Sequence, residues 1–293
     1  MENLSLKGLG VAIVTPFKED LSIDYDALSR LINHIIEGEA DYLVVLGTTA
    51  ETPTLSEDEK GEICRIVKVI NKGRLPLVLG IGANDTYKVV ERIRNFDLTD
   101  FSAILSVVPY YNKPTQEGIY LHFKTIAELS PLPIIVYNIP GRTGVNMTAK
   151  TTLRLANDCP NIIGIKEASG NLPQIEEIIN KKPDSFKVIS GDDCNTLPLM
   201  KSGASGVISV VANIFTKDLH DLTHACLEEK FEKAEILNEK LKLFYKLLFE
   251  EGNPAGIKSA LSAIGLIKNI LRLPLTPVSK NIAYKIETFI NTY

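Results

Sequence analysis

The chain has 293 residues, of which 45% are apolar and 23% are charged, and its formal net charge is -4. This composition is typical of a globular protein large enough to bury a sizeable core, and the mixed charges exclude the basic footprint of a nucleic-acid-binding protein or of one that binds anionic membranes. No run reaches the roughly 18 apolar residues of a membrane span and no basic, apolar leader opens the chain, so we expect a cytoplasmic protein.

Short apolar runs rich in β-branched residues recur along the chain and predict eight strands. They cover residues 11–15, 42–46, 77–81, 103–108, 134–137, 162–165, 187–189 and 206–211. Segments with helical spacing lie between most of these runs, at residues 25–37, 58–70, 86–96, 118–129, 148–156 and 172–180. Several runs are apolar throughout, which is typical of parallel strands covered by helices on both sides.

An eightfold alternation of strand and helix predicts a closed barrel. An open doubly wound sheet is the alternative, but its dinucleotide-binding motif GxGxxG is incomplete after Gly80-Ile81-Gly82. After the eighth strand, helical stretches near 218–228, 231–249, 256–264 and 278–293 continue the chain. We therefore expect an α/β fold, a (β/α)8 TIM barrel domain at 1–225 with a C-terminal helical extension at 226–293.

Lys166 is the most unusual residue of this pattern, because it stands inside the apolar run of the sixth predicted strand. Burial disfavours the ammonium and lowers the pKa of a lysine, so such an amine can attack a ketone and form a Schiff base. The alternative is a structural lysine that reaches the surface or pairs with a carboxylate such as Glu167. The active site of a barrel lies at the carboxyl ends of its strands, where Lys166 is found.

Polar groups at three other strand ends favour the catalytic interpretation. Thr48 and Thr49 follow the second strand, Tyr111 follows the fourth, and Tyr137 and Arg142 end the fifth. Each alone is more commonly structural, since threonine and tyrosine are good strand formers and arginine often forms a rim salt bridge. Together they offer a phenol and hydroxyls that relay protons and a guanidinium that grips a carboxylate, as a carbinolamine and an acidic substrate require.

His220 and His224 are four residues apart and resemble the zinc-binding pair of a metalloprotease helix. The glutamate of HExxH is missing, so we expect a polar helix face and assign no metal. The four cysteines form no CxxC pair, and we expect them to be reduced and structural: Cys64, Cys159, Cys194 and Cys226.

At these residues the chain resembles the dihydrodipicolinate synthase family of the N-acetylneuraminate lyase superfamily. Motifs in the family's order and spacing run along essentially the whole chain: GVAIVTPF, GTTAE, PYYNKP, YNIPGRTG, IIGIKEASGN, SGDD and GVISVVAN. The resemblance implies condensation of pyruvate with L-aspartate 4-semialdehyde to 4-hydroxy-tetrahydrodipicolinate, in the diaminopimelate route of lysine biosynthesis. It implies no metal or organic cofactor, because the protonated imine is itself the electron sink.

Carried over by position, the resemblance assigns the imine to Lys166 and a proton relay to Tyr137, Thr48 and Tyr111. In the family the counterpart of Tyr111 reaches in from a neighbouring subunit. The resemblance therefore implies at least a dimer, and a homotetramer built as a dimer of dimers.

Four further residues are assigned to substrate binding by the same resemblance. Thr49 would bind the carboxylate of pyruvate, Arg142 that of the aldehyde, and Gly191 and Ile208 would line the pocket. Arg142 also discriminates within the superfamily, because sialic-acid lyases and keto-deoxy-sugar aldolases generally lack GRTG. Another pyruvate-dependent aldolase and a non-catalytic barrel are the alternatives; the second would be expected to have lost at least one of the four catalytic residues.

The chain departs from the family pattern in two places. Ala50 replaces the usual glycine of GTTGE, a change that we do not expect to abolish activity. Glu57, Lys60 and Lys88 stand where lysine-sensitive members commonly use histidine and a glutamate to hold the inhibitor. Since Lys88 places a positive charge where the inhibitor's amine would lie, we predict weak or absent inhibition by lysine.

Overall fold

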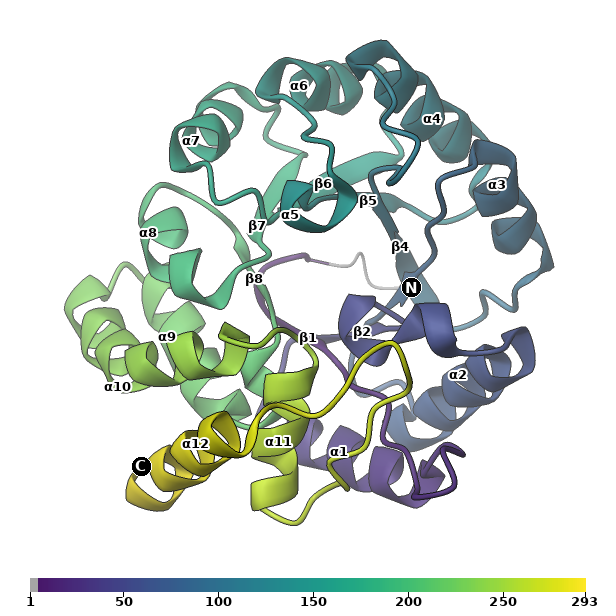
Figure 1. The fold of residues 1–293 in the computed structure, drawn as a ribbon. Coiled ribbons are helices and arrows are strands. Elements are labelled where there is room, and N and C mark those ends of the chain that lie inside the picture. The colour runs from purple at the N-terminus through teal and green to yellow at the C-terminus, as the bar shows by residue number, and fades with distance from the viewer. Residues whose placement is uncertain (1–4) are drawn as a thin grey trace.

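The structure, a computed structural model, is described for residues 5–293, so the first four residues of the predicted barrel domain lie outside the described residues. Eight parallel strands close into a barrel in chain order, and β8 pairs with β1 (Figure 1). This confirms the predicted barrel and rules out the open sheet. The strands are β1 (Gly8–Ala12), β2 (Tyr42–Val45), β3 (Leu77–Gly80), β4 (Phe101–Val107), β5 (Ile134–Asn138), β6 (Ile162–Glu167), β7 (Lys187–Ser190) and β8 (Gly206–Ser209).

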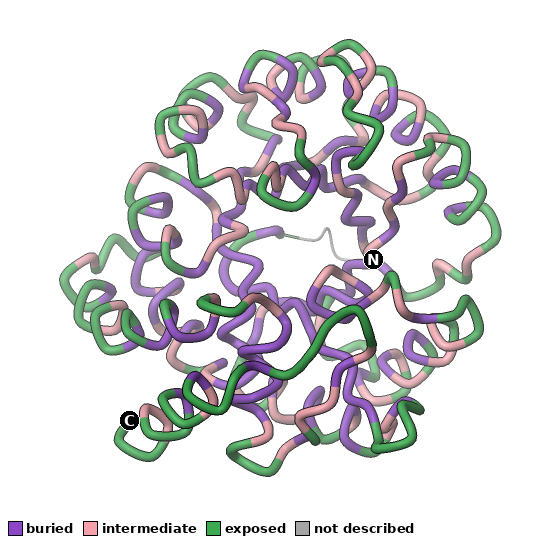
Figure 2. Tube along the Cα trace, in the orientation of Figure 1, coloured by how far each residue is buried: buried purple, intermediate pink, exposed green. Residues whose placement is uncertain are grey.

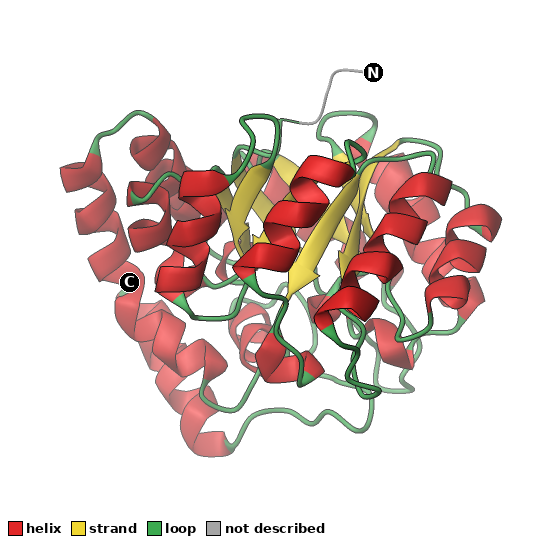
Figure 3. Cartoon of the chain, turned by 90° about the horizontal axis from the view of Figure 1, so that it is seen from above, coloured by secondary structure: helices red, strands yellow, loops and turns green. Residues whose placement is uncertain are grey.

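Helices form the outer layer, and the strand arrows all point to one end of the barrel (Figure 3). Polar caps set several helix starts: the Asp24 side chain accepts from the Ala27 N–H, and Ser56 forms a reciprocal capping box with Glu59. The predicted helices are confirmed, and their ends agree closely. The barrel helices are α1 (Tyr25–Glu37), α2 (Glu57–Asn71), α3 (Thr86–Asn95), α4 (Gln116–Leu129), α5 (Pro140–Thr143), α6 (Ala149–Asp158), α7 (Leu172–Lys181), α8 (Thr196–Lys201) and α9 (Thr216–Leu227).

The first strand was predicted three residues too late, at 11–15 instead of Gly8–Ala12. β-propensity favours the branched residues, but closure of the barrel here requires glycines. A Cβ on Gly10 would lie 2.2 Å from the Tyr42 ring, and a Cβ on Gly206 would lie 2.0 Å from the carbonyl oxygen of Gly8. The short helices α5 and α8 were not predicted, because four and six residues are too few to show a helical period.

Apolar side chains form two buried layers, one between strands and helices and one inside the barrel. The strands are buried along their length, whereas buried and exposed residues alternate along the helices (Figure 2). The inner layer contains Ala12, Val44, Val78, Leu105, Ile135, Tyr137, Ile189 and Ile208. It fills the barrel beneath the strand ends, so any cavity must lie above it.

Three helices follow the barrel: α10 (Phe231–Phe249), α11 (Ala255–Ala263) and α12 (Lys280–Thr292). They gather on one side of the molecule beside α9 (Figure 1). Segments of this extension reach back to the barrel, where Lys258 forms an ion pair with Glu51 and both side chains are fully buried. The division between residues 225 and 226 stays a prediction. Within residues 5–293, every helix is too short or too polar to cross a bilayer.

Candidate active site

A cavity of about 460 Å³ opens at the carboxyl ends of the strands. Four of the eight predicted site residues line it: Thr48, Tyr137, Arg142 and Lys166. Tyr110 joins them from the loop after β4. The fold therefore brings together, from three different strand ends, half of the groups that the sequence predicted to act on one substrate.

Lys166 lies near the end of β6 with only 6% of its surface exposed. Its Nζ is 4.4 Å from the centre of the Tyr137 ring, which stands opposite it in register on β5. Burial lowers the pKa of Lys166 to about 8, the carboxylate of Asp193 opposes this shift, and the Arg142 guanidinium adds to it. Roughly a tenth of such amines is neutral at pH 7, several hundred times more than for an ordinary lysine.

The alternative in which Lys166 pairs with Glu167 is wrong. Successive residues of a strand point to opposite faces, so the two side chains diverge. Both carboxylate oxygens of Glu167 accept from the Asn138 amide at 3.1 Å, and one also accepts from the Ser169 N–H at 2.9 Å. Lys166 is therefore left without this counter-ion and points into the barrel mouth.

Tyr137 is buried beside the amine. Burial raises the pKa of its phenol to about 12, although the nearby Arg142 guanidinium and the Thr48 hydroxyl lower it. The phenol is consequently protonated at neutral pH and suited to donate a proton to an oxygen near Lys166. Thr48 begins the one-turn helix Thr48–Ala50, which follows β2 after Leu46 and Gly47.

Thr49 and Arg142 are linked through Asn253, a residue of the C-terminal extension. The Asn253 amide donates to the Thr49 hydroxyl at 3.0 Å, and Arg142 Nη2 donates to the Asn253 carbonyl oxygen at 2.8 Å. Thr49 is itself buried and is not among the residues lining the cavity. Asn253 was not predicted, since only its position before a proline marks it in the sequence.

Gly191 and Ile208 are not among the residues that line the cavity. A Cβ on Gly191 would lie 3.0 Å from both Cγ and Cε of Lys166, so this glycine leaves room for the lysine side chain. Ile208 is buried in the inner layer of the barrel together with Tyr137. The two residues therefore belong to the packing around the two central side chains of the site, Lys166 and Tyr137.

Tyr111 also does not line the cavity, and it is exposed at the surface of the single chain. Its side chain is 88% exposed, and its backbone has a φ of 72°, which is uncommon for a bulky residue. The neighbouring Tyr110 lines the cavity instead. The loop therefore holds one tyrosine against the site and presents the other outward.

Asp193 was missed as a site residue, although the SGDD motif contains it. Its carboxylate accepts from the Ser209 hydroxyl and from the Val210 N–H at 3.1 Å. Burial raises the pKa of Asp193 to about 6, and these hydrogen bonds lower it, so the group is mostly ionised at pH 7. Its negative charge raises the pKa of Lys166.

Replacing Asp193 with asparagine is expected to lower the pKa of Lys166 further. Only the neutral amine attacks a ketone, so kcat/KM for pyruvate should rise with pH until about 8 in the wild type and level off at a lower pH in Asp193→Asn. The pH profile of kcat/KM measures this. Glu167→Gln, which neutralises a buried carboxylate on the opposite face of β6, is the control and should not change the pH at which kcat/KM levels off. If the pH profiles of the wild type and Asp193→Asn are identical, the role assigned to Asp193 is wrong.

The substitution at Ala50 is accommodated by the local backbone. Ala50 ends the one-turn helix Thr48–Ala50, its N–H donates to the Gly47 carbonyl oxygen at 3.1 Å, and its methyl group is buried. The left-handed conformation falls on the next residue, Glu51, with a φ of 55°. Alanine therefore costs the loop no strain at this position.

The predicted lysine-insensitive region is strongly charged. Lys60 Nζ pairs with Glu57 at 2.7 Å, and Lys60 and Arg92 both line the wall of the active-site cavity. Lys88 lies next to this region and lines a separate groove of about 820 Å³ between α2 and α3. Glu57 is already paired with Lys60 and Arg92, and the carboxylates of Asp58 and Glu91 also line the groove. The prediction therefore rests on Lys88, which forms no ion pair among residues 5–293.

Free lysine is accordingly expected to inhibit the enzyme weakly or not at all at concentrations up to about 1 mM, an ordinary metabolite concentration. A dose-response curve at subsaturating pyruvate measures this. Norleucine has the same four-carbon side chain as lysine but lacks the side-chain ammonium, so it is the control ligand. It should inhibit at least as strongly as lysine does. Strong inhibition by submillimolar lysine that norleucine does not reproduce would contradict the electrostatic explanation.

Known proteins with similar sequences belong to the same family that the sequence motifs indicate. The chain matches the sequence model of the Dihydrodipicolinate synthetase family over residues 5–292. A 4-hydroxy-tetrahydrodipicolinate synthase of Phocaeicola vulgatus is 53% identical over 286 residues, which are 98% of this chain and 96% of that protein.

Two solved structures show the same fold over nearly the full length. A monomeric dihydrodipicolinate synthase variant superposes with a TM-score of 0.96 at 39% identity, covering 99% of this chain and 98% of that one. The chloride-inhibited dihydrodipicolinate synthase of Acinetobacter baumannii, complexed with pyruvate, superposes with a TM-score of 0.95 at 39% identity and 98% coverage of both chains.

Proposed function

The chain belongs to the dihydrodipicolinate synthetase family, and from this membership we propose how its own residues carry out the reaction. The protein is a lyase that condenses pyruvate with L-aspartate 4-semialdehyde to 4-hydroxy-tetrahydrodipicolinate in lysine biosynthesis. The observation that carries the proposed mechanism is the buried amine of Lys166, whose pKa is about 8 and which stands beside Tyr137 at the barrel mouth.

In the first half of the proposed mechanism, neutral Nζ of Lys166 attacks C2 of pyruvate. The ketone oxygen takes up a proton from the Tyr137 phenol, which is protonated at neutral pH because its pKa is about 12. Nζ then gives up the proton that is in excess after the attack, and the Thr48 hydroxyl, next to the phenol, passes it to the Tyr137 phenolate. Tyr137 next protonates the resulting hydroxyl, and loss of water leaves a protonated imine between Lys166 and pyruvate beside a Tyr137 phenolate.

In the second half, the Tyr137 phenolate takes a proton from C3 of the imine, which becomes an enamine. The enamine C3 attacks the aldehyde carbon of L-aspartate 4-semialdehyde and forms the new carbon–carbon bond, while the aldehyde oxygen takes up that proton from Tyr137 and becomes a hydroxyl. The neutral amino group of the same substrate then attacks C2, loses a proton to the phenolate and displaces Lys166, which closes the ring and restores the free amine. The water of the first half is the only other product.

Tyr111 is proposed to complete the proton relay in the site of a second copy of the chain. The support is its 88% exposure, on the same loop that presents Tyr110 to its own cavity. We accordingly propose at least a dimer, and a homotetramer arranged as a dimer of dimers, although a similar solved protein is a monomeric variant. Sedimentation equilibrium of the purified chain distinguishes these states.

Thr49 is proposed to bind the carboxylate of pyruvate, and Arg142 that of the aldehyde. The two are held in one hydrogen-bonded chain by Asn253, and Arg142 also lines the cavity that contains Lys166. Gly191 and Ile208 are proposed to shape the pocket through their packing around Lys166 and Tyr137. A guanidinium presents two parallel N–H donors, which match the two oxygens of a carboxylate.

Replacing Arg142 with alanine is expected to raise KM for L-aspartate 4-semialdehyde by about 10- to 100-fold, the worth of a charge-assisted hydrogen bond, and to leave KM for pyruvate nearly unchanged. Steady-state kinetics in a coupled assay measures both constants. Arg142→Lys keeps the positive charge but not the two parallel N–H donors. Its KM for L-aspartate 4-semialdehyde should therefore lie between those of the wild type and Arg142→Ala. Equal effects on both substrates would contradict the assignment, and turnover of a keto-sugar acid without turnover of the semialdehyde would favour another aldolase.

We also propose the cytoplasm as the compartment of the reaction. The four cysteines are all free thiols, which fits a reducing compartment: Cys64, Cys159, Cys194 and Cys226.

A further inference from the structure

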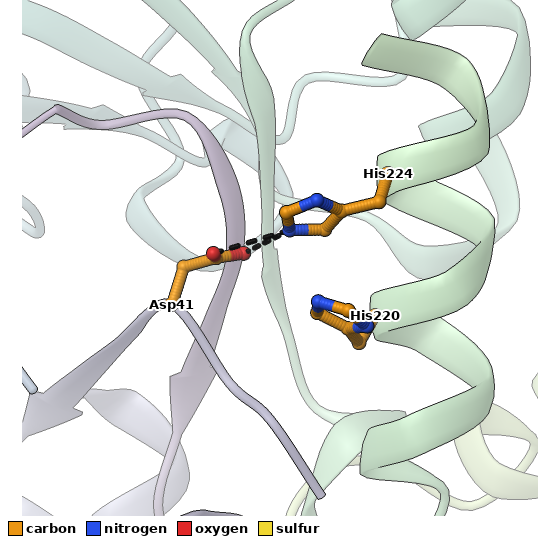
Figure 4. A group of neighbouring side chains, drawn as sticks. All are labelled: Asp41, His220 and His224. Atoms are coloured by element: carbon orange, nitrogen blue, oxygen red, sulfur yellow. Dashed lines mark hydrogen bonds and ion pairs between the residues drawn. The ribbon is translucent and has the colours of Figure 1, made fainter. Parts of the chain in front are cut away.

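Asp41, His220 and His224 form a cluster of side chains far from the active site (Figure 4). Asp41 directly precedes β2, so it lies at the amino-terminal end of the barrel, whereas Lys166 lies at the carboxyl-terminal end. The two histidines face Asp41 from α9. One possible ligand atom from each residue lies within 4.8 Å of the other two.

We propose that this Asp41 cluster binds one divalent transition-metal ion, with zinc as the expected occupant. Residues four apart on a helix lie on the same face, and the two imidazole rings are only 4.0 Å apart between centres. Two imidazoles and one carboxylate are a ligand set that suits zinc and leaves the fourth tetrahedral position for water. The proposal is independent of the condensation reaction.

Only small side-chain rotations are needed for the three side chains of the Asp41 cluster to surround an ion. With metal–ligand bonds of roughly 2.1 Å, the ligand atoms of a tetrahedral zinc site are about 3.4 Å apart. Nε2 of His224 already lies 3.0 Å and 3.1 Å from the two carboxylate oxygens of Asp41. His220 is the ligand that must move, from at most 4.8 Å.

Surrounding groups hold the three side chains in place. The Leu9 N–H donates to Oδ2 of Asp41 at 2.6 Å, which fixes the orientation of this carboxylate. Nδ1 of His220 lies 3.2 Å from a carboxylate oxygen of Asp221, which leaves Nε2 to bind the ion. A carboxylate behind a metal-binding histidine is the usual arrangement that orients the ring and increases its basicity.

Gly8 gives the cluster its space. A Cβ at this position would lie 2.1 Å from Oδ2 of Asp41 and 3.2 Å from Nε2 of His224, and the backbone has a φ of 81°. A side chain on residue 8 would therefore occupy the volume between the carboxylate and the imidazole. Glycine keeps this volume open beside the backbone of β1.

The local charge also favours a cation. Glu39 and Asp221 flank the histidines, and both are linked to Lys217, at 2.8 Å and 2.9 Å respectively. Together with Asp41, three carboxylates face one ammonium in this region. Because Lys217 holds the two outer carboxylates, Asp41 is the oxygen ligand left for the ion.

Isothermal titration of the chelator-treated full chain with zinc chloride tests the proposal. We expect one zinc ion per chain, and an affinity at least tenfold lower in each of Asp41→Asn, His220→Asn and His224→Asn. Asparagine keeps a polar side chain at each position, and Asp41→Asn keeps an acceptor for the Leu9 N–H. His34→Asn, in α1, and Cys194→Ser, which removes an exposed thiol, are the controls and should bind within twofold of the wild type.

A second measurement uses the unmodified protein, in case a variant does not fold. Cobalt in place of zinc is expected to give the visible absorption of a tetrahedral nitrogen and oxygen site without the near-ultraviolet band of a thiolate. Absence of stoichiometric zinc binding would overturn the proposal. So would unchanged affinity in both histidine variants, or loss of binding in Cys194→Ser.

Discussion

Replacing Lys166 with alanine is expected to lower turnover by about 10⁴-fold or more, because the proposed mechanism forms every covalent intermediate on its amine. No other amine is proposed to take its place. The coupled assay with pyruvate and L-aspartate 4-semialdehyde measures the loss. The melting temperature should change little, since truncation removes a group whose burial lowers its pKa to about 8 and is therefore unfavourable for its charged form.

Lys166→Arg is the matched control for this prediction. Arginine retains a long cationic side chain, but its guanidinium is permanently protonated and cannot form an imine. We therefore expect Lys166→Arg to be as inactive as Lys166→Ala. Turnover within tenfold of the wild type in either variant would contradict the assigned role.

Replacing Lys258 with methionine is expected to lower the free energy of unfolding by about 3–5 kcal/mol, because it leaves the Glu51 carboxylate buried without its counter-ion. Both side chains of this pair are fully buried, and Lys258 also donates to the Ile270 carbonyl oxygen at 2.9 Å. The melting temperature should fall on the order of 10 °C. Denaturant unfolding of the two proteins measures the difference.

The double variant Glu51→Gln/Lys258→Met tests whether charge is the cause. It removes the unpaired carboxylate while the glutamine oxygen can still accept from the Arg272 N–H, which lies 3.0 Å from Glu51. We expect it to recover most of the stability lost in Lys258→Met. If the double variant is less stable than Lys258→Met, the loss comes from packing and the electrostatic explanation is wrong.

The Glu51 pair also matters for the site. Glu51 directly follows the one-turn helix that carries Thr48 and Thr49, and its partners Lys258 and Arg272 belong to the C-terminal extension. The extension thus holds the loop of the two threonines from behind, as Asn253 holds Thr49 and Arg142 from the side. Stability of the extension and geometry of the active site are linked through these contacts.

Much of the fold follows from periodicity alone. Helices such as Tyr25–Glu37 and Phe231–Phe249 have a clear apolar stripe, and their predicted bounds are those of the structure. The strand β1 was misplaced because barrel closure at Gly8 and Gly10 depends on contacts with β8 and β2, which no local propensity describes. Lys166 could be found because a lysine in an apolar strand is unusual in itself.

Residues that act through distant contacts were not predictable. Asp193 influences Lys166 from another strand end, and Asn253 reaches Thr49 from the extension. Nothing in the sequence indicates that Asp41 lies near His220, because α9 and the start of β2 meet only when the barrel closes. In each case the residue type is ordinary, and only the tertiary contact gives it a function.

Trapping of the Schiff base tests directly whether Lys166 is the nucleophile. Reduction with borohydride in the presence of pyruvate, followed by proteolysis and mass spectrometry, should add about 72 Da, the mass of a reduced pyruvate imine, to the peptide containing Lys166 and to no other. We expect this adduct in the wild type and its absence in Lys166→Ala. An adduct on a different lysine, or none in an active preparation, would contradict the assignment of Lys166 as the nucleophile.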